Sequence, residues 1–437
     1  WQKSAEPGSY SNNFDIRGYD APLVIIDGVP RDVQDFQRLN ANDIDDISVL
    51  KDASVAIYGV RSANGVILVT TKKGSKEGKT KVSYNGSFTI QQPSDMPKLA
   101  DPYGTMTLYN EKAMNKVDGG NIIYGEDQFE AFRNGSRRAT DWNSLIFSDH
   151  SPQTQHDISI SGGNERTQYY IGMGYFYQEG FFKSGDLNYE KYNIRSNIST
   201  RILKGLTFEL NLSAFLDERN SPYYSSVDII RNYWSQGVLY PAYADPENTM
   251  LNYKGLELEN NTVAFMTSDV SGYKKNKQKN IQSSASLNYD FGTITPVLKG
   301  LSAKALFSYD YRLDNNESYR KEYYQYAYDD LTDTYTQKLY NNSSPSNLLR
   351  KQQTLAQLIL NYNRTFGEHS ISGLVGWETQ KRQGDNFYAQ RNLAFSVPYL
   401  FVGEDTAQQG GMYSGNSDLY EEANSALIGR VNYALST

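Results

Sequence analysis

The sequence predicts an all-β transmembrane barrel that follows a compact region of mixed α/β character. Three observations favour it: an excess of aromatic residues at a low mean hydropathy of -0.64, long segments that alternate apolar and polar residues, and short connections that alternate with long ones. Of the 437 residues, 36 are Tyr, 18 are Phe and 4 are Trp. Aromatic girdles around a polar lumen explain this composition. A secreted, glycan-binding β-protein with exposed stacking platforms would also explain it.

Composition argues against several other classes. The formal net charge of -7 does not suit a nucleic-acid partner, which requires a basic patch. Cysteine is absent and the three histidines, His150, His156 and His369, lie far apart, so we expect no disulfide and no metal site. No apolar run reaches the roughly 18 residues of a transmembrane helix, and no signal peptide opens the chain. No nucleophile elbow or phosphate loop is present, so we expect neither an enzyme nor a cofactor.

Residues 1–78 read as the compact mixed region. Asp27 and Gly28 form a turn pair between apolar runs, with glycine supplying a positive φ. Asp43 can cap a short helical turn. Asn64 and Gly65 predict a tight turn into a strand at 66–71. The glycine-rich stretch at 74–78 marks the boundary to residues 79–437.

Long alternating segments are the main evidence for membrane-spanning strands. In 206–217 one face is apolar throughout: Leu206, Phe208, Leu210, Leu212, Ala214 and Leu216. A period of two puts these side chains and the mostly polar set between them on opposite faces of one strand. Such segments approach the roughly 9–11 residues of a tilted spanning strand and exceed the roughly 5–6 of a typical globular strand.

The connections between these segments give a second signal. Strands are predicted at 81–92, 154–163, 167–178, 189–201, 206–217, 279–291, 300–313, 350–363, 369–382 and 425–436. The connections after the second, fourth, sixth and eighth strands are short. The others are longer loops, with helical patterns at 108–117 and 127–133. Short turns on one side and long loops on the other are typical of an outer-membrane barrel, whereas a soluble sandwich has no reason to sort its loops.

A series of motifs in residues 14–74 points to a family. They are Ile16-Arg17-Gly18, Ile26-Asp27-Gly28-Val29-Pro30, Val49-Leu50-Lys51-Asp52-Ala53, Tyr58-Gly59 with Arg61, and Ala63-Asn64-Gly65-Val66-Ile67. Together they resemble the plug signature of the SusC/RagA family of TonB-linked outer-membrane proteins. The segments 158–163 and 178–180 resemble early barrel strands of the same family.

The resemblance implies a mixed α/β plug domain inside the lumen of a β-barrel. Residues 1–78 would be the C-terminal part of the plug, and 79–437 the first half of the barrel with its long extracellular loops. Family barrels have about 22 strands, of which about the first ten are present here. An open barrel would leave strand edges unpaired in the bilayer, so we expect the chain to be part of a longer protein. The TonB box and the N-terminal extension of the family are not in this chain.

The same resemblance implies TonB-dependent active import of oligosaccharides across the outer membrane of a Gram-negative bacterium. The implied partners are a SusD-like surface lipoprotein that acts as a lid, TonB, outer-membrane lipid and the cargo, but no nucleic acid. The resemblance also allows a dimer of two transporter–lipoprotein pairs. Alternatives are RagA-like import of oligopeptides, a siderophore or cobalamin receptor, an open porin, and a soluble glycan-binding β-protein.

Candidate site residues fall into two groups. The plug motif residues are predicted to be mainly structural: Arg17, Gly18, Asp27, Gly28, Lys51, Asp52, Tyr58, Gly59, Arg61, Asn64 and Gly65. Among them Lys51, Asp52 and Arg61 could pair inside a wet lumen. The second group consists of loop aromatics that could face the ligand or the lid: Trp142, Tyr223, Tyr224, Tyr233, Trp234 and Tyr413. For each of these, a girdle contact is the alternative. No catalytic residue is predicted.

Overall fold

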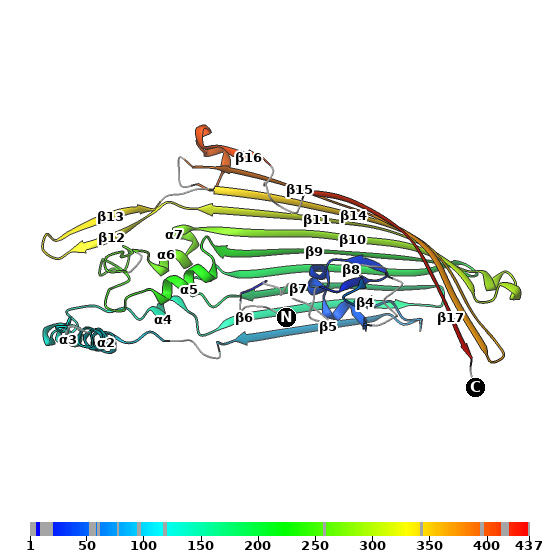
Figure 1. The fold of residues 1–437 in the computed structure, drawn as a ribbon, viewed down its shortest axis with the longest axis horizontal. Coiled ribbons are helices and arrows are strands. Elements are labelled where there is room, and N and C mark those ends of the chain that lie inside the picture. Colours follow the sequence, from blue (N-terminus) through cyan, green and yellow to red (C-terminus); the bar gives the residue numbers. More distant parts are fainter. Residues whose placement is uncertain are drawn as a thin grey trace.

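The computed structural model describes residues 6–8, 21–51, 58, 62–76, 78–93, 98–116, 120–256, 259–340, 344–393, 397–411 and 419–435. A small mixed sheet near the N-terminus lies against one face of a large antiparallel sheet (Figure 1). Helices gather at one end of the large sheet, which we call the loop end; the opposite end is the turn end.

The small sheet has the strand order β2-β1-β4-β3. β1 (Leu23–Ile26) and β2 (Val29–Arg31) form a hairpin, and β1 runs parallel to β4 (Val66–Thr71), which pairs antiparallel with β3 (Ile44–Leu50). Helix α1 (Val33–Arg38) and the 3₁₀ turn η1 (Ala41–Asp43) connect β2 to β3. The apolar runs of β1 and β4 form the core of this domain, with Val24, Ile26, Ile67 and Val69 buried against Phe36 and Leu39.

The two turns predicted for this domain are confirmed. Asp27 and Gly28, at the tip of the hairpin, have φ angles of 53° and 87°, which only a residue tolerant of the left-handed region adopts at low cost. Gly65 has a φ of 99° directly before β4. The predicted cap is wrong: Asn40, not Asp43, caps η1, because its side chain accepts from the backbone N–H of Asn42.

The large sheet follows chain order from β5 to β11 and continues through β14 and β15, with β16 and β17 both paired to β15. Its strands are β5 (Lys81–Gln91), β6 (Ser151–Gly163), β7 (Thr167–Glu179), β8 (Asn188–Leu203), β9 (Leu206–Pro222), β10 (Gly272–Asp290), β11 (Leu301–Arg320), β14 (Ser344–Phe366), β15 (His369–Arg391), β16 (Gln409–Gly411) and β17 (Tyr420–Leu435). Every strand predicted from the sequence is present.

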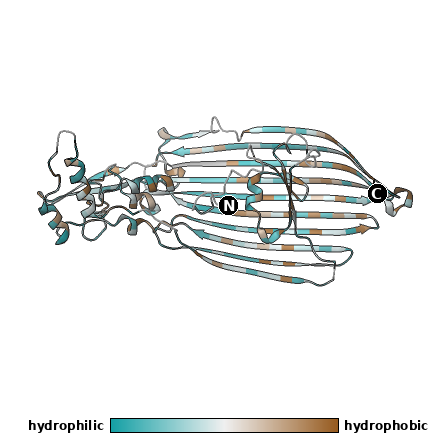
Figure 2. Cartoon of the chain, turned by 60° about the horizontal axis from the view of Figure 1, so that its bottom comes forward, coloured by the Kyte–Doolittle hydropathy of each residue, from teal (hydrophilic) through white to brown (hydrophobic). Residues whose placement is uncertain are grey.

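The hydropathy of successive residues changes back and forth along the strands of the large sheet, as the period of two predicts (Figure 2). On the inner face, toward the small sheet, polar residues such as Arg195, Asn197 and Asp217 are buried. On the outer face, apolar residues such as Ile194 and Phe307 are exposed, at 44% and 56%. An apolar outer face and a polar inner face are the arrangement of a wall between hydrocarbon and an aqueous lumen.

At the loop end the connections fold into a second core. They contain α2 (Pro102–Met114), α3 (Glu126–Arg133), α4 (Trp142–Ile146), α5 (Ser226–Trp234), α6 (Thr262–Met266), α7 (Ser268–Ser271) and the hairpin of β12 (Tyr323–Asp329) and β13 (Thr334–Tyr340). The short 3₁₀ turns are η4 (Phe291–Thr293) and η5 (Pro296–Leu298) after β10, and η6 (Leu400–Val402) and η7 (Asp405–Ala407) before β16. Buried side chains from α2, α4, α5 and α6 meet in one hydrophobic cluster, and partly buried side chains of α3 and α7 pack against it. None of the helices in the described ranges is both long and apolar enough to cross a bilayer.

Two expectations about the loops need correction. The strands extend further toward the loop end than predicted, for example to Arg320 in β11 and from Ser344 in β14. The segment at 314–349 is therefore mostly strand and hairpin. In β11 the reason is physical: residues 314–318 are polar on both faces, so the alternation in hydropathy stops while the backbone ladder continues. The predicted helix at 108–117 begins at Pro102, after the N-cap Asp101, whose side chain accepts from the backbone N–H of Gly104.

Candidate functional site: the plug–wall interface

The inner face of the large sheet wraps around the small domain. We call the described residues within 21–76 the plug and the strands of the large sheet the wall. The plug segment 31–43 alone contacts strands from β6 to β15. The contact surface between the two, the plug–wall interface, is the candidate functional site, because anything that passes along the inner face must displace it.

A buried charge cluster occupies the centre of this interface. Arg195 on β8 is 4% exposed, and its guanidinium lies 3.4 Å from the Asp43 carboxylate and 3.7 Å from that of Asp27. The Tyr170 hydroxyl on β7 donates to Asp43 at 2.8 Å. Thr71 donates to Asp27 from its backbone N–H and from its hydroxyl. Burial raises the pKa of Asp43, while Arg195 and Tyr170 favour the ionised carboxylate.

A second cluster is built on Asp157 of β6. Asn40 donates to one carboxylate oxygen at 2.5 Å, and Asn42 donates to the other at 2.7 Å. Gln155 on the same strand also donates to Asp157 at 2.7 Å. Asn40 is the N-cap of η1 and Asn42 lies within it, so this turn is held to the wall by amide hydrogen bonds. A buried carboxylate requires such donors, because its desolvation is otherwise costly.

Ion pairs between the plug and later strands surround these clusters. Arg31 forms a two-pronged contact to Asp310 on β11, at 2.9 and 3.3 Å. Arg38 reaches Asp217 on β9 at 3.0 Å. Further pairs join Asp32 to Arg382 on β15 at 2.7 Å and Lys73 to Glu209 on β9 at 2.7 Å. In each pair, one residue belongs to the plug and the other to the wall. Together the pairs therefore fix the position of the plug on the wall.

Asp35 is a titratable group in this interface. Its carboxylate accepts from Asn280 on β10 at 2.7 Å. Burial and the neighbouring Asp32 and Asp310 carboxylates raise the pKa of Asp35 to about 6, against the opposing effect of Arg31 and Arg312. The side chain keeps some access to solvent although it is densely surrounded. Its charge therefore changes in a mildly acidic range.

Two glycines on β7 let the plug approach the wall closely. A Cβ at Gly172 would lie 2.6 Å from the Asp43 carboxylate, and one at Gly174 would lie 2.6 Å from both Asn40 and Asp157. Real Cβ atoms do not approach other atoms so closely. These positions explain why the strand interior carries Gly-x-Gly, which otherwise weakens a strand.

Apolar contact between plug and wall is small. Among the hydrophobic clusters of the described residues, one joins the two: Val29 of the plug with Leu306 and Leu355 of the wall. Hydrogen bonds exchanged for bonds to water contribute only about 0.5–1.5 kcal/mol each, and buried ion pairs add little net stability. The interface therefore defines the position of the plug without the large hydrophobic area that would make its removal prohibitive.

The structure places some of the predicted plug residues in the plug–wall interface and others away from it. Asp27 and Gly28 lie in the interface, Asp27 in the Arg195 cluster and Gly28 beside Lys304. Lys51 is exposed at the end of β3, and Tyr58 and Asn64 are partly buried. Gly65 has the predicted turn geometry. Arg17, Gly18, Asp52, Gly59 and Arg61 lie outside the described residues.

Some of the predicted loop aromatics are buried in the loop-end core and others are exposed. Trp142 and Tyr233 are 1% and 2% exposed in the loop-end core, so for them the expectation of a ligand-facing side chain is wrong. Trp142 donates its indole N–H to the carbonyl of Gly237, which satisfies the polar end of a buried ring. Tyr224 stacks on Phe265 at the edge of that core. Tyr223 and Trp234 remain candidates: Tyr223 lies under Lys274 and Arg320, and Trp234 is 48% exposed. Tyr413 lies outside the described residues.

Sequence reasoning missed the wall side of the interface. Asp157, Arg195, Asp217 and Asp310 sit at polar positions of alternating strands, where a lumen-facing side chain is ordinary. The one signal available in the sequence was the presence of charged residues on strands that otherwise carry mostly Ser, Asn or Gln at their polar positions. Which of these charges meets the plug depends on the register and curvature of the sheet. Among the described residues no group of His, Cys, Asp and Glu could hold a metal ion.

Comparison with known proteins agrees with this geometry. The family model "TonB-dependent Receptor Plug Domain" matches residues 2–66. TonB-dependent receptor P26 of Formosa agariphila is 36% identical over 230 residues, which are 50% of this chain and 22% of that protein. TonB-dependent receptor SusC of Bacteroides thetaiotaomicron is 31% identical over 208 residues, 46% of this chain and 19% of that protein.

Solved structures show the same fold. The RagAB peptide importer in its open-open state matches with a TM-score of 0.70 at 23% identity, over 97% of this chain and 47% of that chain. The chain thus covers less than half of the length of each of these three proteins.

Residues 2–66 thus match the plug domain of TonB-dependent receptors, and a small mixed domain on the polar inner face of a large antiparallel sheet is the fold that the chain shares with the RagAB importer. In sequence, the chain is similar to the TonB-dependent receptor SusC over 46% of its length.

Proposed function

We propose that this chain supplies the plug and part of the wall of an importer that carries oligosaccharides across the outer membrane, driven through TonB. Residues 1–78 would belong to the plug and residues 79–437 to the barrel, with the loop end outside the cell. The polar character of the plug–wall interface carries the proposal. A plug that must seal the lumen and yet be displaced during transport needs contacts that are specific but individually weak.

The energetics of the interface support this reading. Each plug–wall ion pair and amide bond can be replaced by water when the plug moves, at a small net cost per contact. The exception is the buried apolar cluster of Val29 with Leu306 and Leu355, the one such cluster that joins plug and wall among the described residues. A permanent domain interface would instead bury a continuous apolar surface, as the obligate interfaces of proteins do.

The loop-end core supports a partner on that side. Helices α2, α4, α5 and α6 share buried side chains and α3 packs against them with partly buried ones, so the loop end is an ordered platform and not a set of independent loops. We propose that a SusD-like lipoprotein covers this platform as a lid, and that Tyr223 and Trp234 are candidates for contact with it or with cargo. A dimer of two such pairs is compatible with the proposal.

Cargo uptake by cells is the test of this function. A strain that lacks the full-length gene is compared with its parent for growth on single oligosaccharides and on defined oligopeptides, each with and without functional TonB. Loss of growth on an oligosaccharide in both mutant strains supports the proposal. Loss on oligopeptides alone would assign the peptide class, which the name of the RagAB importer gives for that protein. Unchanged growth on every cargo would refute a role in nutrient import.

A further inference from the structure

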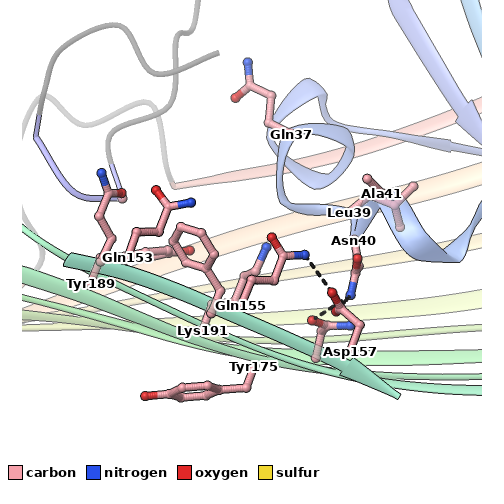
Figure 3. A pocket seen from close by; sticks show the side chains of 14 residues that line it. Gln37, Leu39, Asn40, Ala41, Gln153, Gln155, Asp157, Tyr175, Tyr189 and Lys191 are labelled. Atoms are coloured by element: carbon pink, nitrogen blue, oxygen red, sulfur yellow. Dashed lines mark hydrogen bonds between the residues drawn. The ribbon is translucent and has the colours of Figure 1, made fainter. Parts of the chain in front are cut away.

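The inner-face cavity of about 250 Å³ between η1 and β6–β8 belongs to the plug–wall interface (Figure 3). Asn40 and Gln155 on its lining both donate to Asp157, and the Lys191 ammonium donates to the carbonyl of Arg38 at 3.3 Å. These groups hold the plug in place. The outer face of the wall carries a hollow of a different chemistry.

An apolar groove of about 340 Å³, which we call the outer groove, crosses β11, β14, β15 and β17. Leu301 borders it from β11 and is six positions from the exposed Phe307, so the two side chains share the outer face. The register of the four strands places the lining in two neighbouring rows. The row nearer the turn end holds Leu301, Tyr362, Gly373 and Val431, and the next row holds Leu360, Val375 and Gly429.

Two glycines keep the outer groove open. Among the described residues, a Cβ at Gly429 would meet no atom within 4 Å, and one at Gly373 would meet the carbonyl oxygen of Arg430 alone, at 3.7 Å. The side chains beside them, Val375 and Val431, are 64% and 79% exposed. Glycine inside a strand weakens it and often marks a place where another molecule approaches the backbone closely. The floor of the groove is therefore accessible backbone with apolar walls.

A cation and aromatic rings border the outer groove on its turn-end side. Arg364 follows Tyr362 by two positions, so it lies on the same face, about 7 Å nearer the turn end. Its guanidinium donates to the carbonyl of Val297 in η5 at 3.0 Å and lies 4.8 Å from the ring centroid of Phe366. Tyr433 on β17 occupies the same row as Arg364. The bond to Val297 uses one of the five N–H donors of the guanidinium, so it fixes the side chain and leaves other donors for an anion.

The groups follow one another along the outer face in the order of a glycerophospholipid. An arginine binds phosphate through strong charge-assisted hydrogen bonds. Aromatic side chains lie at the headgroup level of a membrane, and an apolar channel accepts an acyl chain. A peptide in the same groove would bring backbone N–H and C=O groups against outward-facing side chains that are apolar apart from Tyr362, which is costly. The chemistry therefore favours a lipid over a protein segment.

We propose that the outer groove binds one acyl chain of a glycerophospholipid whose phosphate group accepts from the Arg364 guanidinium. Gly373 and Gly429 give the chain room to lie against the strand backbone. Because lipid tails are as apolar as the groove, the chain gains from close packing alone, and the phosphate contact supplies the selectivity. This inference rests on the proposed import function in one respect: the outer face must meet the bilayer, with the turn end in its periplasmic leaflet.

The test measures lipid binding to the purified full-length transporter by native mass spectrometry from detergent micelles. The probes are dioleoylphosphatidylglycerol, dioleoylphosphatidylethanolamine, and dioleoylglycerol, which has the same chains but no phosphate. Gly429→Leu fills the groove, and Arg364→Gln removes the cation. One matched control, Ala214→Leu, adds apolar bulk to the outer face of β9. The other, Arg166→Gln, removes a turn-end arginine that also donates to a backbone carbonyl, that of Arg201 at 3.3 Å. Amide hydrogen exchange of β14 and β15 confirms that the strands stay paired in each variant.

We expect one molecule of either phospholipid to bind the wild-type protein, with Kd raised about tenfold by each groove variant and unchanged by each control. Dioleoylglycerol should bind about tenfold more weakly than the phospholipids. Phospholipid binding that neither groove variant weakens would overturn the site, and so would equal weakening by the controls. Dioleoylglycerol binding as tight as that of the phospholipids would refute the phosphate contact. Failure of the import function itself shows separately, as unchanged growth of the deletion strain.

Discussion

Replacing Arg195 by methionine is the sharpest test of how the plug is held. The side chain lies at the centre of the plug–wall interface, 4% exposed, between the carboxylates of Asp43 and Asp27. Methionine keeps most of the length of the stem but removes the charge. The change leaves two carboxylates buried on the plug with the hydroxyls of Tyr170 and Thr71 as their remaining side-chain donors.

The expected magnitude follows from the geometry. Removing one partner of a buried ion pair costs about 3–5 kcal/mol, because the other charge stays desolvated. The distances of 3.4 and 3.7 Å exceed the roughly 2.7–2.9 Å of strong charge-assisted hydrogen bonds, which places Arg195 at the low end. A cost of about 3 kcal/mol shifts the equilibrium between seated and released plug about 150-fold.

Native-state hydrogen exchange on the full-length transporter measures this shift. The amides of β1 and β4 should lose about 150-fold in protection in Arg195→Met, while the amides of the wall strands keep theirs. The control is Arg350→Met. It removes an ion pair to Asp385 of similar chemistry but with both side chains about half exposed, which is worth less than about 1 kcal/mol.

Two results would refute this account of the interface. One is plug protection in Arg195→Met equal to that in Arg350→Met, which would mean that the central cluster does not hold the plug. The other is failure of the carboxylate-to-amide changes at Asp27 and Asp43 to restore protection in the Arg195→Met background. If desolvation of the unpaired Asp27 and Asp43 carboxylates causes the loss of protection, replacing them with amides must restore most of that protection.

Three further predictions follow from the same structure. Gly174→Val should unseat the plug turn and raise exchange in β4, because its side chain would overlap the plug, whereas Gly429→Val, whose Cβ meets nothing within 4 Å, should not. Trp142→Ala should lower the unfolding free energy of the loop-end core by about 3–5 kcal/mol, measured by limited proteolysis, while Trp234→Ala should change it by less than about 0.5 kcal/mol and weaken lid or cargo binding instead. Because the pKa of Asp35 is raised to about 6, the seated plug binds a proton more tightly than the released plug. Seating should therefore weaken as pH rises from about 4 to 6, by at most about 1.4 kcal/mol per unit, and Asp35→Asn should remove this component of the pH dependence of β4 exchange.

Local patterns were enough to predict the wall. Alternation in segments such as 206–217 specified which side chains lie on the apolar outer face and which lie on the polar inner face, because the period of a strand is two whatever its neighbours are. Turn residues such as Asp27 and Gly28 specified the plug hairpin, because few residues tolerate a positive φ. Where alternation faded, beyond about residue 313 in β11, the prediction ended too early although the strand continued.

Charge partners and burial were decided by the tertiary structure. Arg195 and Asp43 are 152 positions apart, and nothing local marks them as a pair; the curvature of the sheet brings them together. The burial of Trp142 in the loop-end core depends likewise on helices contributed by several connections. Composition and periodicity thus determined that this chain forms a polar-lined wall with a folded domain before it. Only the assembled sheet decided which polar side chains bind the plug, because long-range contacts depend on register and curvature and not on neighbouring residues.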